Sequence, residues 1–156
     1  AEEYYELCCK LKNTFNDISL TTDIIVGFPG ETQKDFEETL AFAKKCGFMK
    51  VHVFPFSPRE GTPAFRYPDK ILNSIKNERC AILQKECDHV RNTFMSEYIE
   101  KTVSVLFETP KNGIQQGYTK NYTPVSVEYP HNLCGKILPV KITAVDENGC
   151  TGIIQE

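Results

Sequence analysis

Hydrophobic and polar residues alternate along the first hundred positions with two different periods. In residues 3–12 an apolar side chain recurs every third or fourth position, which predicts an amphipathic helix. Residues 19–27 end in a continuous apolar run, Ile24 to Val26, which is typical of a strand buried on both faces of a parallel sheet. The chain therefore opens with a helix followed by a buried strand.

A turn and a second helix follow this strand. Residues 27–32 contain two glycines and a proline, and Thr32 is a good N-cap residue with Asp35 three positions later. The helical pattern that follows ends at Gly47, a residue that favours helix termination. Residues 51–56 then read as a second strand. The order helix, strand, helix, strand predicts βα units and a parallel sheet.

The pattern changes near residue 100. Residues 57–63 form a loop rich in proline and glycine, and residues 68–100 show a long helical pattern. Five short strand-like runs separated by turn residues come next, which predicts a small barrel or sandwich. They are residues 102–107, 113–119, 123–128, 137–145 and 149–154. We therefore expect a domain at residues 1–100 and a second at residues 101–156.

Two loops at the predicted carboxyl ends of the strands are candidates for ligand binding. Gly27 and Gly30 would let a ligand approach the backbone, although the spacing matches neither a P-loop nor a dinucleotide-binding turn. Arg59, in the loop after the second strand, could clamp a phosphate or carboxylate. The alternatives are a tight turn without a ligand and a solvated arginine paired with Glu60 or another acidic residue.

The string GYTKNY at residues 117–122 is a candidate for binding single-stranded RNA. Its tyrosines could stack on bases, Lys120 could meet a phosphate, and Asn121 could bond a base edge. The alternative is a hairpin turn whose two tyrosines pack in the core.

Composition adds limits to this picture. Apolar residues make up 40% of the 156 residues and charged residues 25%, as in globular proteins. The net charge of −3 does not signal a basic nucleic-acid-binding domain, and no apolar run approaches the ~20 residues of a membrane helix. Without a signal peptide, the seven cysteines read as reduced cytosolic thiols, mostly buried. We interpret His52, His89 and His131 as structural, and we predict no metal site.

Three strings resemble one family, the radical-SAM methylthiotransferases that modify tRNA. They are TDIIVGFPGET at residues 22–32, HVFPFSPREGTPA at 52–64, and GYTKNY at 117–122. The second string is closest to the branch that acts on N6-threonylcarbamoyladenosine beside the anticodon. The third resembles the opening of the family's TRAM domain, a small RNA-binding barrel.

This resemblance implies a fold. Residues 1–100 would be the C-terminal part of a (β/α)6 partial TIM-like barrel, and residues 101–156 a five-stranded OB-like TRAM barrel. The rest of the partial barrel would belong to a missing N-terminal part of the same polypeptide. The abrupt helical start of the chain agrees with this expectation.

The resemblance also implies cofactors and partners. Contacts to S-adenosylmethionine would come from Val26, Gly27, Phe28, Pro29, Phe54, Pro55 and Phe56. Contacts to tRNA would come from Arg59, Tyr118, Lys120, Asn121, Tyr122 and Lys136. The C-x3-C-x2-C loop that holds the family's 4Fe-4S cluster is absent from the sequence. We therefore expect this chain alone to be inactive, to retain neither cofactor, and to belong to a cytoplasmic enzyme with no membrane partner.

Other functions remain open at this stage. The chain could be a non-catalytic RNA-binding module with a radical-SAM remnant, or a small-ligand-binding α/β domain that uses only the Gly27 turn. Within the family, the branches acting on isopentenyladenosine or on a ribosomal protein are alternatives to the threonylcarbamoyladenosine branch.

Overall fold

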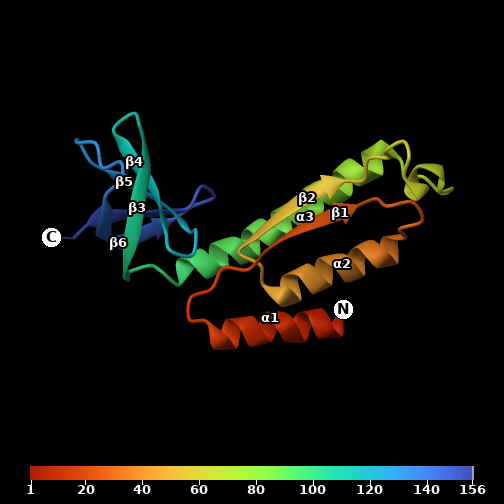
Figure 1. The fold of residues 1–156 in the computed structure, drawn as a ribbon, viewed down its shortest axis with the longest axis horizontal. Coiled ribbons are helices and arrows are strands. Elements are labelled where there is room, and N and C mark those ends of the chain that lie inside the picture. The colour runs from red at the N-terminus through yellow and green to blue at the C-terminus, as the bar shows by residue number, and fades with distance from the viewer. Residues whose placement is uncertain (156) are drawn as a thin grey trace. The chain divides into compact units, whose positions relative to one another are not determined.

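The computed structural model describes residues 1–155, apart from the side chain of Lys111 (Figure 1). Its contacts divide the chain into two compact units. The first, which we call the α/β unit, contains Ala1–Phe15 and Leu20–Val90. The second, the barrel unit, contains Asn16–Ser19 and the chain from Arg91 onward. The division falls inside a helix, and the domain boundary near residue 100 stays a prediction.

The α/β unit is built on two parallel strands that lie side by side in Figure 1. The strands are β1 (Thr21–Val26) and β2 (Lys50–Pro55), and the chain between them forms α2 (Gln33–Cys46). The predicted βαβ arrangement is therefore confirmed. The remaining elements are α1 (Glu2–Thr14), the short 3-10 helix η1 (Pro63–Arg66) and α3 (Asn73–Ser96), which continues past the unit's boundary.

The helices of this unit pack on one face of the sheet only. Val26 and Val51 are buried in one cluster with Phe36 of α2 and Leu83 of α3, and Cys8 of α1 joins the same cluster. On the opposite face, Ile25 is 58% exposed and Phe54 is 49% exposed. The prediction that the first strand is buried on both faces is therefore wrong for Ile25, because no described element covers that side.

Local signals set the boundaries of α2. The Thr32 side chain accepts a hydrogen bond from the Asp35 backbone N–H at 3.2 Å, and the Asp35 carboxylate accepts one from the Thr32 backbone N–H at 2.8 Å. The helix ends at Gly47, as predicted. The predicted helix at residues 68–100 is shorter at both ends in the structure, because residues 68–72 and 97–100 lie outside α3.

Five strands of the barrel unit close on themselves, as predicted. The order around the barrel is β3-β4-β5-β7-β6, and all neighbours are antiparallel except β5 and β7. Alternate residues point inward, among them Val105, Phe107, Val125 and Ile142, each at most 1% exposed. The strands are β3 (Thr102–Lys111), β4 (Ile114–Thr119), β5 (Pro124–Glu128), β6 (Ile137–Val145) and β7 (Cys150–Ile154). β3 runs beyond its predicted end at residue 107, past a bulge between Phe107 and Thr109.

Within residues 1–155, no helix is both long enough and apolar enough to cross a membrane.

Candidate functional sites

A cleft of about 520 Å³ opens at the carboxyl ends of β1 and β2, beside the start of α3. Ligands in parallel α/β folds bind at this end of the strands. Gly27, Pro29, Pro55 and Phe56 line the cleft, and Lys70 and Lys76 add positive charge to it. Four of the seven residues expected to contact a cofactor therefore meet at one cleft.

The other three lie elsewhere. Val26 is completely buried in the core of the α/β unit. Phe28 is 43% exposed, and its ring packs edge-on against Phe56 with centroids 5.0 Å apart. Phe54 stands on the uncovered face of the sheet, where its ring stacks on His52 with centroids 6.5 Å apart. None of these three residues lines the cleft itself, although the Phe28 ring packs on Phe56, which does.

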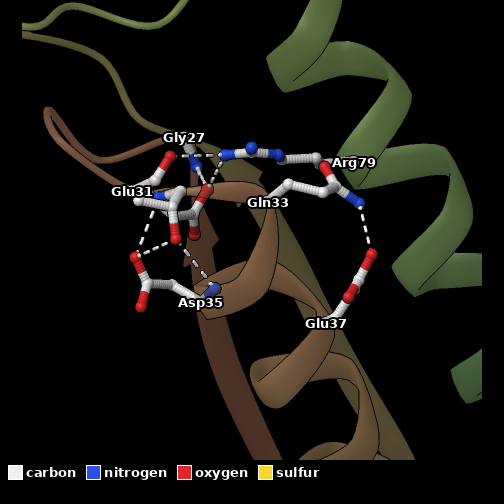
Figure 2. Close-up of polar contacts among 7 residues, drawn as sticks. Gly27, Glu31, Gln33, Asp35, Glu37 and Arg79 are labelled. Carbon is white, nitrogen blue, oxygen red and sulfur yellow. Dashed lines mark hydrogen bonds and ion pairs between the residues drawn. The ribbon is translucent and has the colours of Figure 1, made fainter.

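A buried ion pair holds the Gly27 turn in shape (Figure 2). The Glu31 carboxylate accepts hydrogen bonds from the Gly27 backbone N–H at 2.7 Å and from Arg79 Nη1 at 2.5 Å. Arg79 Nη1 also donates to the Glu31 backbone carbonyl at 3.1 Å. Because the two side chains are only 7% and 11% exposed, these charge-assisted bonds are shielded from water. The pair fixes the wall of the cleft.

Lys76 also contacts this turn, through its aliphatic stem, and the strand end beside it, through its ammonium group. Its ammonium donates to the Phe56 carbonyl at 2.9 Å, and the residue is 9% exposed. Its aliphatic stem fills the space beneath Gly27, where an added Cβ would lie 2.2 Å from Lys76 Cγ. Gly27 also has a φ of +74°, so both backbone conformation and space require glycine there.

The sequence did not reveal Arg79 and Lys76 as residues of this site. They lie some fifty residues after the turn, in the helical pattern of α3, and only the packing of α3 brings them to it. The Gly27–Glu31 spacing of four residues was the one local signal.

Much of the backbone at the cleft is already hydrogen-bonded within the protein. The Phe56 N–H donates to the Val26 carbonyl at 2.8 Å, the Gly27 N–H donates to Glu31, and the Phe56 carbonyl accepts from Lys76. Each of these carbonyls keeps a second lone pair. The cleft thus offers proline and phenylalanine surfaces, the Phe56 carbonyl and two lysines, which is the mixture of apolar walls and a few polar groups typical of small-molecule sites.

The second candidate site is the outer surface of the barrel at the turn after β4. Tyr118 is 41% exposed and Tyr122 is 77% exposed, and their ring centroids lie 6.0 Å apart. The alternative that these tyrosines pack in the core is therefore wrong. Tyr122 has a φ of +63°, an unfavourable conformation for a bulky residue, and such strain is found mostly where function needs it.

Two further apolar residues extend this surface. Leu106 of β3 is the direct cross-strand partner of both Tyr118 and Ile137, and Ile137 is 66% exposed. We call this row the apolar stripe; its members are Ile137, Leu106, Tyr118 and Tyr122. Lys120 and Lys136 are exposed; Lys120 lies two positions from both Tyr118 and Tyr122 in the sequence, and Lys136 directly precedes Ile137. Sequence reading missed Leu106 and Ile137 because the strand register decides which side chains are neighbours.

Asn121 is engaged inside the barrel unit. Its amide donates to the Asp17 carbonyl at 3.0 Å and to the Tyr98 hydroxyl at 2.7 Å, and its side-chain oxygen accepts from Thr123 Oγ1 at 3.0 Å. These bonds tie the turn to residues 16–19. Its contact with RNA stays a prediction.

Arg59 is exposed in the loop after β2 and does not line the cleft. Among residues 1–155, no three His, Cys, Asp or Glu side chains converge as metal ligands would. Cys8, Cys46, Cys87 and Cys150 are buried thiols, while Cys134 is exposed.

Comparison with known proteins bears on both sites. No protein-family model matches the chain. The threonylcarbamoyladenosine tRNA methylthiotransferase MtaB of Bacillus subtilis is 38% identical over 138 residues, which are 85% of this chain and 31% of that protein. The tRNA-2-methylthio-N(6)-dimethylallyladenosine synthase of Bacillus subtilis is 42% identical over 144 residues, 90% of this chain and 28% of that protein. By sequence, the chain belongs to the tRNA methylthiotransferase family.

The similarity reaches both units of the chain. The synthase of the same name from Oceanobacillus iheyensis is 37% identical over 158 aligned residues, which are 99% of this chain and 30% of that protein. The tRNA methylthiotransferase relatives are thus about three times as long as the chain compared with them.

Proposed function

We propose that this chain is the C-terminal part of a radical-SAM tRNA methylthiotransferase, which adds a methylthio group to C2 of an N6-modified adenosine next to the anticodon. The observation that carries this proposal is identity of 37–42% to such enzymes over 85–99% of the chain. Within the family we favour N6-threonylcarbamoyladenosine as the substrate, because residues 52–64 resemble that branch.

The cleft would contribute to the S-adenosylmethionine site. Gly27 would allow close approach to the backbone, while Pro29, Pro55 and Phe56 would contact the adenine ring. When bound beside a 4Fe-4S cluster, S-adenosylmethionine supplies the radical chemistry. The cluster's ligands would come from the part of the polypeptide that precedes this chain. The residues of this chain bind and orient the nucleoside portion, and Glu31 and Arg79 hold the turn that does so.

Two matched glycine variants test this role of the cleft. Gly27 and Gly30 both have positive φ, +74° and +85°, so alanine imposes similar backbone strain at each. Only at Gly27 would the new Cβ collide with Lys76, because nothing lies within 4 Å at Gly30. In the full-length protein, Gly27→Ala should abolish S-adenosylmethionine binding measured by calorimetry, and Gly30→Ala should largely preserve it. If both variants lose binding equally, backbone strain and not the collision with Lys76 lowers the affinity. That result would contradict the proposed role of the cleft.

The barrel unit would bind tRNA. Exposed aromatic rings stack on unpaired bases at about 1–3 kcal/mol per base, and lysines neutralise phosphates. The apolar stripe supplies the aromatic rings, and Lys120 and Lys136 supply the positive charges. The chain has no tryptophan and seven tyrosines, so the contribution of the stripe to tyrosine fluorescence is the difference between the native chain and its Tyr122→Ala variant. An anticodon stem-loop RNA should quench it, and Tyr122→Ala should weaken binding about tenfold.

Salt dependence separates the charged contacts from the stacking contacts. Replacing both Lys120 and Lys136 by alanine should lower the slope of log K against log salt by about 1.4, or 0.7 for each contact. Tyr122→Ala should leave that slope unchanged. An unchanged slope in the double lysine variant would remove both lysines from the RNA-binding surface.

A second candidate is an RNA-binding module without chemistry, which the closed barrel and its exposed stripe favour. The intact mass of the native protein, with peptides mapped upstream of Ala1, separates the two. A protein about three times longer that carries C-x3-C-x2-C supports the enzyme. A native mass near 17.8 kDa leaves the RNA-binding module.

A further inference from the structure

The uncovered face of the β1–β2 sheet carries three layers of paired side chains. We call it the open face. Residues on β1 and β2 that share this face are direct partners in the parallel register: Thr21 with Lys50, Asp23 with His52, and Ile25 with Phe54. All six are exposed in the described chain.

Polarity changes in steps along this face. The layer nearest the carboxyl ends of the strands, Ile25 and Phe54, is apolar. The next layer inward pairs a carboxylate with an imidazole, and the His52 ring stacks on Phe54 at an interplanar angle of 21°. Lys50 adds a positive charge one layer deeper. Successive layers are about 6.6 Å apart, since a strand rises about 3.3 Å per residue.

The Asp23–His52 layer is not explained by packing. In α/β barrels the helices lie outside, and the face of the strands away from them lines the interior, where bulky apolar residues normally fill the layers. All three helices of this unit pack against the opposite face. A carboxylate and an imidazole enclosed in a barrel would be costly unless they bound a polar partner. Their place below an apolar layer at the catalytic end suggests that the partner is the substrate.

We infer that the open face binds the modified adenosine of the tRNA, and that Asp23 and His52 select a polar N6 substituent bearing a carboxylate. This rests on the proposed function. Ile25 and Phe54 contact the faces of the base. His52 donates a ring N–H to the carboxylate of the substituent, with Lys50 below it adding positive charge. Asp23 accepts a hydrogen bond from the substituent's hydroxyl or N–H, or from the second ring nitrogen of His52.

The selectivity follows from desolvation. A threonylcarbamoyl group carries a carboxylate, a hydroxyl and N–H groups that can satisfy both side chains. A dimethylallyl group is wholly apolar and would leave Asp23 and His52 enclosed without partners. Sites built to hydrogen-bond a substrate reject analogues that lack the polar groups far more strongly than apolar pockets reject analogues that gain them.

The test is equilibrium binding to the full-length protein without S-adenosylmethionine. Two anticodon stem-loop RNAs are compared that differ only in the N6 substituent, threonylcarbamoyl or dimethylallyl. The native protein should prefer the threonylcarbamoyl RNA by about 10- to 100-fold, the range for hydrogen bonds to charged groups. His52→Leu should reduce that preference to less than about threefold. His52→Gln, which keeps an N–H donor, should restore part of it, and Asp23→Asn should lower it less than His52→Leu.

The matched control is His131→Leu, the same substitution at an exposed histidine of the barrel unit, which should leave the preference unchanged. A native protein with no preference, or one that prefers dimethylallyl, overturns the inference. The inference is also overturned if the His52→Leu variant keeps the preference, or if it binds both RNAs more weakly by the same factor. Methylthio transfer is assayed separately by mass spectrometry of tRNA nucleosides. No transfer to either tRNA, with the binding preference present, would reject the proposed function and leave the recognition site standing.

Discussion

The barrel unit closes its sheet on itself, whereas the α/β unit leaves its sheet uncovered on one face. In the barrel unit every strand has two neighbours, and the inner side chains form a closed core. In the α/β unit, among residues 1–155, β1 is paired only with β2, and Ile25 and Phe54 are exposed. Closure removes the strand edges that would otherwise bind another chain. Exposed apolar residues therefore mean different things in the two units.

The apolar stripe lies on a closed barrel whose strands are all paired, so its exposed side chains mark a binding surface. On the two-stranded sheet, exposed apolar residues mark the side on which a parallel sheet normally meets further structure or substrate. We therefore expect the two units to differ in stability, with the α/β unit unfolding first.

Core truncation should have the largest effect. Phe107 is 1% exposed in the barrel and Phe36 is 2% exposed in the α/β unit. Replacing either by alanine should lower the free energy of unfolding of its own unit by about 3–5 kcal/mol. Urea unfolding followed by the helical signal at 222 nm and by amide NMR signals of the barrel would separate the two transitions.

The matched control for Phe107→Ala is Leu106→Ala, the neighbouring outward-facing residue. It should change stability by less than about 1 kcal/mol, because it truncates a side chain that is 39% exposed. If each phenylalanine variant lowers both transitions equally, the two units unfold as one and the comparison is wrong.

Breaking the buried ion pair should have the next largest effect. Glu31→Gln leaves Arg79 charged and without its carboxylate, which costs about 3 kcal/mol in the α/β unit. Glu38→Gln is the control, because Glu38 forms an exposed pair with Lys34 whose loss costs less than about 0.5 kcal/mol. Thermal unfolding would measure both. Similar small losses would mean that the buried pair contributes little to the Gly27 turn.

Much of this architecture could be predicted from local sequence patterns. The βαβ order, the Thr32 cap, the stop at Gly47 and the five strands of the barrel were all expected and are confirmed. These features depend on residues close together in the chain. Both ends of α3 were misplaced, because the helical spacing includes Leu72 and Tyr98 while the backbone at residues 68–72 and 97–100 is not α-helical.

The side chains that complete the candidate sites could not be predicted in the same way. Arg79 and Lys76 reach the Gly27 turn only because α3 packs beneath it. Leu106 and Ile137 join the tyrosines only through the register of three strands. His52 read as structural because its strand is apolar, and only the pairing with Asp23 shows that both share the open face.

Alkaline pH should destabilise the barrel unit through Tyr98. Burial and the hydrogen bond to Asp17 raise the pKa of Tyr98 to about 12. Since the folded-state pKa exceeds the usual value of 10, this contribution to stability is complete below pH 10 and is lost as the pH rises towards 12. Two pH units correspond to about 2–3 kcal/mol.

The Tyr98→Phe variant isolates this effect from other groups that titrate at high pH. The difference in unfolding free energy between the native protein and Tyr98→Phe should be constant between pH 7 and pH 9 and should then shrink. A difference that does not change up to pH 12 would show that Tyr98 does not titrate as the buried network requires.

The smallest expected effect concerns the cap of α2, and it should be confined to the α/β unit. Thr32→Ala removes the side chain that caps the helix, which typically costs about 1 kcal/mol. Thr39→Ala makes the same change inside α2, where no cap is lost, and should cost less. The hydrogen bonds from Thr32 also hold the pKa of Asp35 below its usual value. The native protein should therefore lose its extra unfolding free energy over Thr32→Ala as the pH falls below about 4, because the carboxylate is then protonated. Because the barrel unit contains neither residue, its transition should not move in either variant; a shift there would mean that the open sheet and the closed barrel support one another.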